Sequence, residues 1–228
     1  MPPEEKWVRV EFHCHTAVSI DSSNRIDRLL KTARECGLDR LCITDHNTIQ
    51  PALKAQAMDP QLVVVGEEIR TTEGELLAYF VTQEVQPDQS PQHTIEQLKK
   101  QNAFISVAHP FDRRRHHWSE ESLRIIRPNL DGIEIFNSRC FNPLANAKAA
   151  NFALENSLPG LVGSDAHSLV ELGLASMRLP IFCSADELRQ VLFQAEITAQ
   201  PFTPLKHFLA NASIFFAKVM PCNWGNIY

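Results

Sequence analysis

Residues 7–15 read WVRVEFHCH, and this stretch decides how the rest of the chain is interpreted. Apolar and polar side chains alternate from Trp7 to Phe12, which predicts a β-strand that runs directly into His13-Cys14-His15. Side chains two residues apart on a strand share a face, so His13 and His15 are placed to chelate one ion. Histidines in strands are also found buried with a purely structural role, and the His-x-His motif alone leaves both interpretations open.

The same arrangement, an apolar run that leads to histidine or a carboxylate, recurs along the chain. Further strands are predicted over residues 41–44, 62–65, 76–81, 104–108, 132–136 and 161–163. The polar residues that follow or lie in these runs include Asp45-His46, Glu67-Glu68, His109, Glu134 and Asp165-Ala166-His167. In a closed β/α barrel the carboxyl ends of all the strands gather on one face, where catalytic residues lie. We therefore expect these side chains to converge on one site.

Helical segments alternate with the predicted strands. The helices are expected over residues 24–36, 91–101, 119–126, 143–156 and 184–193. This alternation predicts βαβ units, a largely parallel sheet and an α/β fold. A chain of 228 residues has room for one substantial core, so we expect a barrel over residues 1–200. Residues 201–228 lack the pattern and are expected to form a tail that packs on the barrel or extends from it.

Composition argues against several functions. The formal charge of −5 gives no general attraction to nucleic-acid backbones or anionic membranes. No apolar run approaches the roughly 20 residues of a membrane helix, and the N-terminus lacks the features of a signal peptide. The six cysteines form no C-x-x-C pair. We therefore expect a cytoplasmic protein with free thiols and no evident obligate protein partner.

The order of these motifs resembles the PHP family, named for polymerase and histidinol phosphatase. The matching motifs are His13-Cys14-His15-Thr16 with Asp21, Ile43-Thr44-Asp45-His46-Asn47, Gly66-Glu67-Glu68-Ile69, Val107-Ala108-His109-Pro110-Phe111, Gly132-Ile133-Glu134-Ile135-Phe136-Asn137 and Gly163-Ser164-Asp165-Ala166-His167. They follow the family's order over roughly residues 8–190. The resemblance implies a distorted seven-stranded (β/α) TIM-like barrel that holds three divalent metal ions, zinc, manganese or iron.

Carried over position by position, the resemblance also implies the ligands of each ion. The first ion would be held by His13, His15, Glu68 and Asp165. Glu68 would bridge to a second ion shared with His109, and the third ion would be held by Asp21, His46 and His167. The bridging residue is expected to be Glu68 because the family motif is G-x-E-I, with Glu67 pointing to the opposite side of the strand.

The second ion needs one further ligand, which many relatives supply as a histidine. Glu75 lies seven residues past Glu68 across a tight turn, and the returning hairpin would bring its carboxylate back to the cluster. A carboxylate suits all three candidate metals. His93 is the alternative, but its place at a predicted helix start favours a surface position.

Several residues near the predicted ligands are candidates for supporting roles. Asp45 and Glu134 are expected to orient ligand histidines. Arg139 is a candidate clamp for a substrate phosphate because its forked donors match phosphate oxygens, although a solvated loop arginine is equally compatible. The basic run at residues 113–118, RRRHHW, would steer an anionic substrate or stack a base on Trp118, unless it is a solvated loop.

The predicted activity is hydrolysis of a phosphate mono- or diester of a small molecule or nucleotide, including short nucleic-acid ends. Glu68, His109 and Asp165 would lie at the catalytic centre, where a metal-bridging hydroxide attacks because divalent metals lower the pKa of bound water to roughly 7. One alternative is an amidohydrolase-like hydrolase, since those barrels also begin with His-x-His, but they usually need a bridging lysine and no candidate is evident. Another alternative is a catalytically silent module that keeps the fold for binding or regulation.

Overall fold

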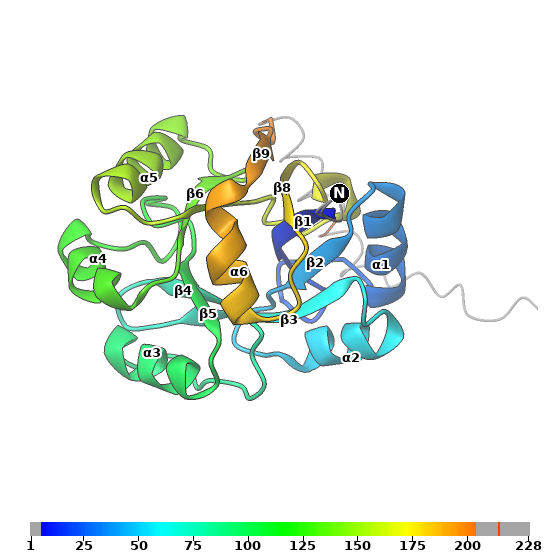
Figure 1. The fold of residues 1–228 in the computed structure, drawn as a ribbon, viewed down its shortest axis with the longest axis horizontal. Coiled ribbons are helices and arrows are strands. Elements are labelled where there is room, and N and C mark those ends of the chain that lie inside the picture. The colour runs from blue at the N-terminus through cyan, green and yellow to red at the C-terminus, as the bar shows by residue number, and fades with distance from the viewer. Residues whose placement is uncertain (1–5, 204–213, 215–228) are drawn as a thin grey trace, which may run out of the picture.

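A curled sheet of seven strands forms the centre of the computed structural model, which describes residues 6–203 and 214, and helices surround it (Figure 1). The sheet runs in the order β5 (Phe104–Val107), β4 (Glu75–Tyr79), β3 (Val63–Arg70), β2 (Arg40–Ile43), β1 (Trp7–Cys14), β8 (Ala175–Pro180) and β9 (Glu196–Ala199). A separate pair of parallel strands consists of β6 (Ile133–Asn137) and β7 (Gly160–Gly163). The α/β class is therefore as predicted.

The expectation of a closed, largely parallel barrel is wrong. Within the large sheet β1, β2 and β3 are parallel, whereas β4 and β5 on one side and β8 and β9 on the other are attached through antiparallel pairings. The tight turn at residues 71–74 is the cause at β4, because parallel strands need a crossover of a dozen or more residues and this turn has no room for one. The large sheet is curled but does not close on itself.

The pair β6 and β7 lies between β5, at one edge of the curled sheet, and the end of β1. Backbone nitrogens of Asp131 and Gly132, just before β6, donate to the carbonyl of Ile105 in β5 at 2.8 and 3.3 Å. On the other side, the His15 nitrogen donates to the Ala166 carbonyl at 3.0 Å. These bonds bring the carboxyl ends of β1, β5 and β7 to the same end of the molecule.

Helices surround the sheet, and the last of them, Ala185–Val191, covers its inner face (Figure 1). They are α1 (Ile26–Glu35), α2 (Gln50–Met58), α3 (Pro91–Lys100), α4 (Glu120–Ile126), α5 (Pro143–Glu155) and α6 (Ala185–Val191), with 3-10 turns at Arg127–Asn129, Leu169–Glu171 and Leu192–Gln194. The sequence did not predict α2, because the residues it buries, Pro51, Ala52 and Ala55, are too small to form a recognisable apolar stripe.

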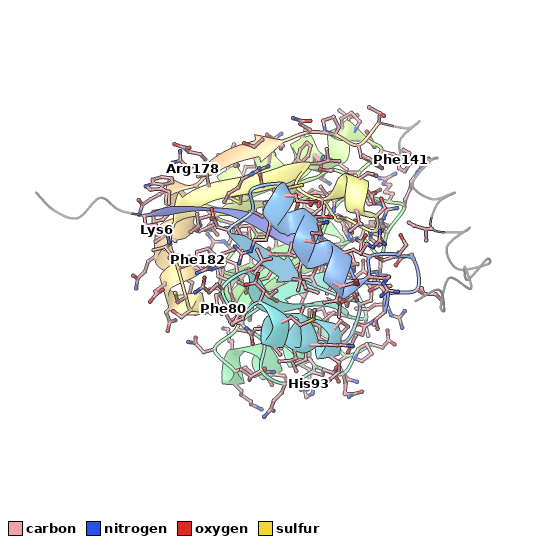
Figure 2. The ribbon with its side chains drawn as sticks, turned by 90° about the vertical axis from the view of Figure 1, so that its right-hand side faces the viewer. Lys6, Phe80, His93, Phe141, Arg178 and Phe182 are labelled. Atoms are coloured by element: carbon pink, nitrogen blue, oxygen red, sulfur yellow. The ribbon has the colours of Figure 1, made fainter. Side chains whose placement is uncertain are left out.

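Alternate residues of the strands belong to two different apolar clusters, one on each face of the sheet. Val63 and Val65 belong to the outer cluster, where β3 packs against helix α2, whereas Val64 belongs to the inner cluster with Tyr79. The inner face also buries Phe12, whose ring stacks 6.5 Å from that of Phe182 (Figure 2). Glu68 follows Val64 by four residues, so the strand directs Glu68 to the inner face and Glu67 to the outer one.

The expectation for residues 201–228 lies mostly outside the described residues. Phe202 is buried, and its nitrogen donates to the Ser138 carbonyl at 2.9 Å. Cys14, Cys36, Cys42, Cys140 and Cys183 are free thiols, whereas Cys222 lies outside the described part. Within residues 6–203, no helix is both long and apolar enough to cross a bilayer.

Candidate metal centre

Four side chains from the ends of β1, β3 and β7 face one common point. The Nε2 atoms of His13 and His15 are 3.1 Å apart. Glu68 Oε2 lies 3.4 and 3.3 Å from these two nitrogens, and Asp165 Oδ1 lies 3.5 and 3.1 Å from them. All four side chains are buried. The structure thus brings together the four residues expected around the first ion.

A second group of donors adjoins the first through Glu68. Its Oε1 atom lies 3.0 Å from His109 Nε2, which is 3.7 Å from Glu75 Oε2. His93, the alternative to Glu75, is exposed on α3, where its ring contacts the Gln97 side chain at 2.8 Å (Figure 2). Of the two candidates for the second ion, the structure therefore places Glu75 at the cluster and His93 on the surface.

Asp21, His46 and His167 form the third group. Asp21 Oδ2 lies 3.0 Å from His167 Nε2, and its Oδ1 lies 3.6 Å from His46 Nε2. His46 Nδ1 lies 3.0 Å from Glu68 Oε2, so this group is continuous with the first. The ring of His15 lies between those of His46 and His167, with centroids 4.5 and 4.3 Å away.

The donor atoms fit divalent cations. Glu68 Oε2, Asp165 Oδ1 and His167 Nε2 are buried and lie 3.0–3.1 Å from imidazole or carboxylate atoms, but these contacts lack the alignment of hydrogen bonds. Buried charged groups are normally hydrogen-bonded, paired or bound to a metal. Imidazole nitrogens mixed with carboxylate oxygens are ligands that zinc, manganese and iron accept.

Electrostatics within the cluster keep Glu68 and Asp165 ionised, whereas burial raises the pKa of Glu75. Burial favours the neutral form of Glu68, but His13 and His46 outweigh it and hold the pKa of Glu68 well below its usual value. Burial likewise opposes the charge on His46, yet Glu68 and Asp21 raise the pKa of His46 to about 11. Protons on His13 and His46 therefore balance the charge of Glu68, whereas burial and the neighbouring His167 lower the pKa of His15 well below its usual value. Divalent cations would compete with those protons for the same nitrogens.

Two of the candidate ligands have an unusual backbone. His109 has φ 24° and Asp165 has φ 54°, both in the left-handed region that side chains other than glycine rarely adopt. Each lies two residues past the end of a strand, β5 or β7. Strained backbone of this kind clusters at functional sites, where the surrounding structure imposes it.

Gly163 permits the close approach of β7 to β1. A Cβ atom at this position would lie 2.4 Å from His13 Cβ and 2.6 Å from Glu134 Oε1. Contacts this short do not occur between real side chains, so any larger residue would push His13 or Glu134 out of place. His13 can therefore occupy its observed position only if residue 163 is glycine.

Glu134 in β6 connects two candidate ligands. Its Oε1 lies 2.9 Å from His13 Nδ1, and its Oε2 accepts hydrogen bonds from the backbone nitrogen of His109 at 2.7 Å and from Asn137 Nδ2 at 3.1 Å. A carboxylate at Nδ1 fixes the proton there and leaves Nε2 available as a ligand atom.

Asp45 supports the cluster less directly than expected. Its carboxylate accepts hydrogen bonds from the backbone nitrogen of Thr16 at 2.9 Å and from Ser19 Oγ at 2.5 Å. Ser19 Oγ in turn lies 3.4 Å from His15 Nδ1. Any orienting effect of Asp45 on a ligand histidine therefore passes through Ser19.

Two buried glutamates near the cluster were not identified from the sequence. Glu11 accepts hydrogen bonds from the backbone nitrogens of His13 at 3.2 Å and Ser164 at 2.8 Å, and burial raises its pKa to about 7. A charged residue inside an apolar strand, two residues before His13, was a signal for it. Glu171 accepts from the His167 nitrogen at 3.0 Å and lies in a 3-10 turn, for which the sequence has no periodic pattern.

One arginine of the basic loop reaches the cluster. Arg115 Nη2 lies 2.9 Å from Asp165 Oδ2, and the charge of Asp165 raises the pKa of Arg115 further. Arg139, the arginine singled out from the sequence, is largely buried, and its Nε atom lies 3.4 Å from Glu171 Oε1. Arg115 thus lies at the candidate ligands, whereas Arg139 forms an ion pair with Glu171.

Trp118 has a structural position, and the expectation that it stacks a base is wrong. Its side chain is 1% exposed, and its Nε1 donates to the Glu75 carbonyl at 3.0 Å. A Cβ atom on Gly74 would lie 2.3 Å from the indole, so the ring packs tightly against the turn before Glu75. Trp118 therefore holds the basic loop and the β4 end together.

The cluster opens to solvent on one side. The side chains of Asp21, His46 and Glu75 are 47%, 25% and 13% exposed, whereas those of His13 and His15 are fully buried. A substrate would therefore approach the second and third groups of donors first.

The chain belongs to the PHP family. The PHP domain model matches residues 11–108, and the PHP-associated model matches residues 143–192. An uncharacterized protein of Methanocaldococcus jannaschii is 31% identical over 157 residues, which cover 63% of this chain and 90% of that protein.

Solved structures share the fold. PsfC from Pseudomonas syringae superposes with a TM-score of 0.70 at 14% identity, covering 94% of this chain and all of PsfC. A protein of Bifidobacterium adolescentis, described as a "putative metal-dependent phosphoesterase", superposes with a TM-score of 0.58 at 18% identity, covering 74% and 90% of the two chains. At these identities the similarity establishes the fold alone.

Proposed function

We propose that this protein is a metal-dependent hydrolase that cleaves phosphate esters. The observation that supports it most is the convergence of His13, His15, Glu68 and Asp165 on one point, with the partly exposed guanidinium of Arg115 beside them. Family membership and the phosphoesterase description of a structural neighbour agree with this function.

The three groups of donors would hold three divalent ions, of zinc, manganese or iron. Glu68 is suited to bridge the first and second, because its Oε2 faces His13 and His15 while its Oε1 faces His109. Such ions neutralise charge on the phosphoryl oxygens and lower the pKa of water to roughly 7, so that hydroxide is available near neutral pH.

The remaining groups would act on the substrate and on the ligands themselves. Arg115 would donate from its guanidinium to a phosphoryl oxygen and stabilise the charge that develops there. Glu134 would hold His13 and the backbone of His109 in place throughout the reaction. In the net reaction a water oxygen forms the new bond to phosphorus, and the ester oxygen leaves as the alcohol after gaining a proton.

The substrate would be a phosphate mono- or diester of a small molecule or of a nucleotide, including short nucleic-acid ends. An amidohydrolase-like reaction is less well supported, because no lysine in residues 6–203 makes an ion pair or hydrogen bond with the candidate ligands. The phosphate clamp predicted for Arg139 remains a proposal, and Arg115 is the better placed arginine for that role.

Turnover of an aryl phosphate by protein reconstituted with manganese, zinc or iron tests this function. We expect Asp165→Asn to lower kcat by at least about 10²-fold, since it removes a negative ligand and an arginine contact. His93→Ala, the matched control on the outer surface of α3, should stay within about twofold of the wild type.

Elemental analysis of the same samples separates the alternatives. A catalytically silent module would bind metal and turn over no phosphoester in a broad panel, and a scaffold that has lost its metal would contain no divalent metal at all. Either result would contradict the proposed function, as would an Asp165→Asn variant with full activity.

A further inference from the structure

Glu171 is a fully buried carboxylate that takes no part in the proposed reaction. Its Oε2 atom accepts hydrogen bonds from the backbone nitrogens of His167 at 3.0 Å and Ser168 at 2.7 Å, and from Ser168 Oγ at 2.6 Å. These three bonds fix the backbone at the point where the His167 side chain begins. The place of His167 Nε2, 3.0 Å from Asp21 Oδ2 in the third group of donors, therefore depends on Glu171.

Arg139 balances the buried charge of Glu171. Its Nε atom lies 3.4 Å from Glu171 Oε1, and the Arg139 side chain is only 10% exposed. No other cationic side chain in residues 6–203 lies within ion-pair distance of Glu171. A buried carboxylate that loses its counter-charge is strongly unfavourable, so the structure around it has to move. Arg139 is thus needed to keep Glu171, and with it His167, in place.

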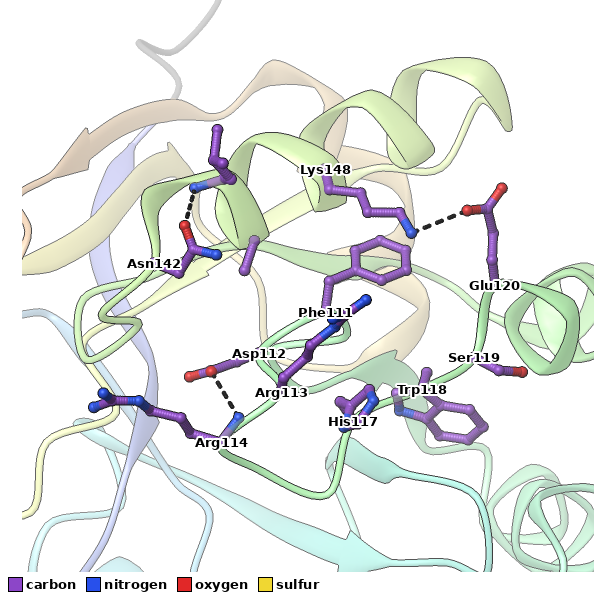
Figure 3. Close-up of a pocket in the computed structure, with 12 residues that line it drawn as sticks. Phe111, Asp112, Arg113, Arg114, His117, Trp118, Ser119, Glu120, Asn142 and Lys148 are labelled. Carbon is purple, nitrogen blue, oxygen red and sulfur yellow. Dashed lines mark hydrogen bonds and ion pairs between the residues drawn. The ribbon is translucent and has the colours of Figure 1, made fainter.

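The loop that carries Arg139 is held at both ends. At its start, the Arg139 backbone nitrogen donates to Asn137 Oδ1 at 2.9 Å. At its end, Asn142 Oδ1 accepts a hydrogen bond from the Leu144 nitrogen at 3.1 Å and so caps α5 (Figure 3). An ordered segment between β6 and α5 therefore presents the Arg139 guanidinium to Glu171.

Loss of this support would affect the third group of donors more than the first. Asp165, the ligand of the first group that is nearest to His167 in the chain, has its own contact with Arg115 Nη2 at 2.9 Å. In the third group, the side chains of Asp21 and His46 are partly exposed, and only that of His167 is fully buried. An ion bound there would therefore depend strongly on the position of His167.

We propose that Arg139 is a positioning residue for the third ion, acting through Glu171 on the backbone of His167 without touching the substrate. This inference rests on the three-ion arrangement of the proposed function. It gives Arg139 a different role from that of a phosphate clamp, in which the guanidinium would contact the substrate itself.

The metal content of Arg139 variants tests the proposal. The full chain is titrated with Mn²⁺, and bound manganese is measured by elemental analysis after equilibrium dialysis. At a concentration that just saturates the wild type with three ions, we expect two in Arg139→Met, because affinity for the third ion should fall about 10- to 100-fold. Arg139→Lys keeps a charge within reach of Glu171 and should retain most of this affinity. Arg139→Gln, a milder substitution without charge, should show the same loss if Arg139→Met does not fold.

A double variant shows whether the effect passes through Glu171. Glu171→Gln removes the charge that needs Arg139, while its side-chain oxygen can still accept from the His167 nitrogen. Arg139→Met with Glu171→Gln should therefore bind the third ion at least about fivefold more tightly than Arg139→Met alone. The matched control is Arg178→Met at the edge of the molecule, which removes an exposed arginine 3.7 Å from Glu196 and should keep three ions (Figure 2).

Failure of this inference differs from failure of the proposed function. Folded Arg139→Met protein that binds three ions with wild-type affinity would overturn the inference, as would a double variant that binds the third ion no better than the single one. A phosphate clamp would leave all three ions in Arg139→Met and raise KM for an aryl phosphate. Wild-type protein that binds three ions, loses the third on substitution of Arg139 and hydrolyses no phosphoester would contradict the proposed function alone.

Discussion

Glu68 is the residue on which most contacts of the candidate centre converge. Its two oxygens lie 3.0–3.4 Å from nitrogens of His13, His15, His46 and His109. The neighbouring Glu67 points to the opposite face of β3, where its Oε2 lies 3.4 Å from the backbone nitrogen of Val85. Adjacent residues of the strand thus have separate surroundings. The expected direction of both glutamates agrees with the structure.

The ligand-type residues could be identified from sequence because each follows a recognisable strand. Some residues that act through hydrogen bonds could not, since Ser19 and Glu171 have no spacing or composition that distinguishes them from other polar residues, whereas Asp45 and Glu134 lie in recognisable motifs. Arg115 is a similar case: the basic run was visible, but nothing in RRRHHW indicates which arginine turns inward.

Glu134→Gln tests whether Glu134 positions a ligand. The amide cannot hold the His13 Nδ1 proton as strongly as the carboxylate, so we expect metal affinity to fall about 10- to 100-fold while the fold is retained. Titration against a chromophoric chelator measures the affinity, and the exposed Glu155→Gln is the control. Unchanged affinity in Glu134→Gln would show that His13 needs no such partner.

Glu67 should make stability depend on pH. Burial raises the pKa of Glu67 to about 8, so the folded protein holds the Glu67 proton more tightly than the unfolded chain does. The stability that this protonated side chain gives is therefore complete below about pH 4.5 and is lost as the pH rises through about 8. Relative to Glu67→Gln, the wild type should lose up to about 4 kcal/mol of unfolding free energy between pH 5 and pH 8.

Urea unfolding of the wild type and Glu67→Gln at several pH values measures this difference. Glu121→Gln, at an exposed position of α4, is the control and should track the wild type throughout. A difference between Glu67→Gln and the wild type that is the same at pH 5 and pH 8 would contradict the assigned pKa.

Among the elements, the strands that end at the candidate centre were predictable and their pairing was not. The hairpin predicted after Glu68 agrees with the antiparallel pair of β3 and β4, but the alternation of strands and helices gave no indication that β5 is antiparallel to β4. β8 was missed although its Ala175, Met177 and Leu179 alternate with Ser176 and Arg178, which is the period of a strand. Local patterns indicate where a strand lies, whereas its partners depend on contacts distant in sequence.

Two glycines of the same short strand make a matched test of packing at the centre. Gly163→Ala places a methyl group 2.4 Å from His13 Cβ, whereas at Gly160 it meets the side chain of Ile135 at 2.5 Å, away from the ligands. Both variants should lose about 1–3 kcal/mol of stability through overpacking. Gly163→Ala alone should lose at least about tenfold in metal affinity, because His13 or Glu134 must move.

Chelator titration and urea unfolding of both glycine variants provide these values. Equal metal affinity in Gly163→Ala and Gly160→Ala would mean that β7 does not fix the position of His13.

At the scale of the whole molecule, the open sheet still gathers its strand ends as a closed barrel would. β6 and β7 contact β5 on one side and the end of β1 on the other. These contacts bring His109, after β5, and Asp165, after β7, close to the residues that end β1. The family models match residues 11–108 and 143–192, so the segment from His109 to Asn142, with the basic loop, lies outside both. We expect substrate choice to be determined in that segment.

Anomalous diffraction from crystals of protein reconstituted with manganese, zinc or iron tests the central claim most directly. The account predicts a peak among His13, His15, Glu68 and Asp165, a second between Glu68, Glu75 and His109, and a third among Asp21, His46 and His167. Crystals of reconstituted protein with no anomalous peak within reach of Glu68 would contradict it.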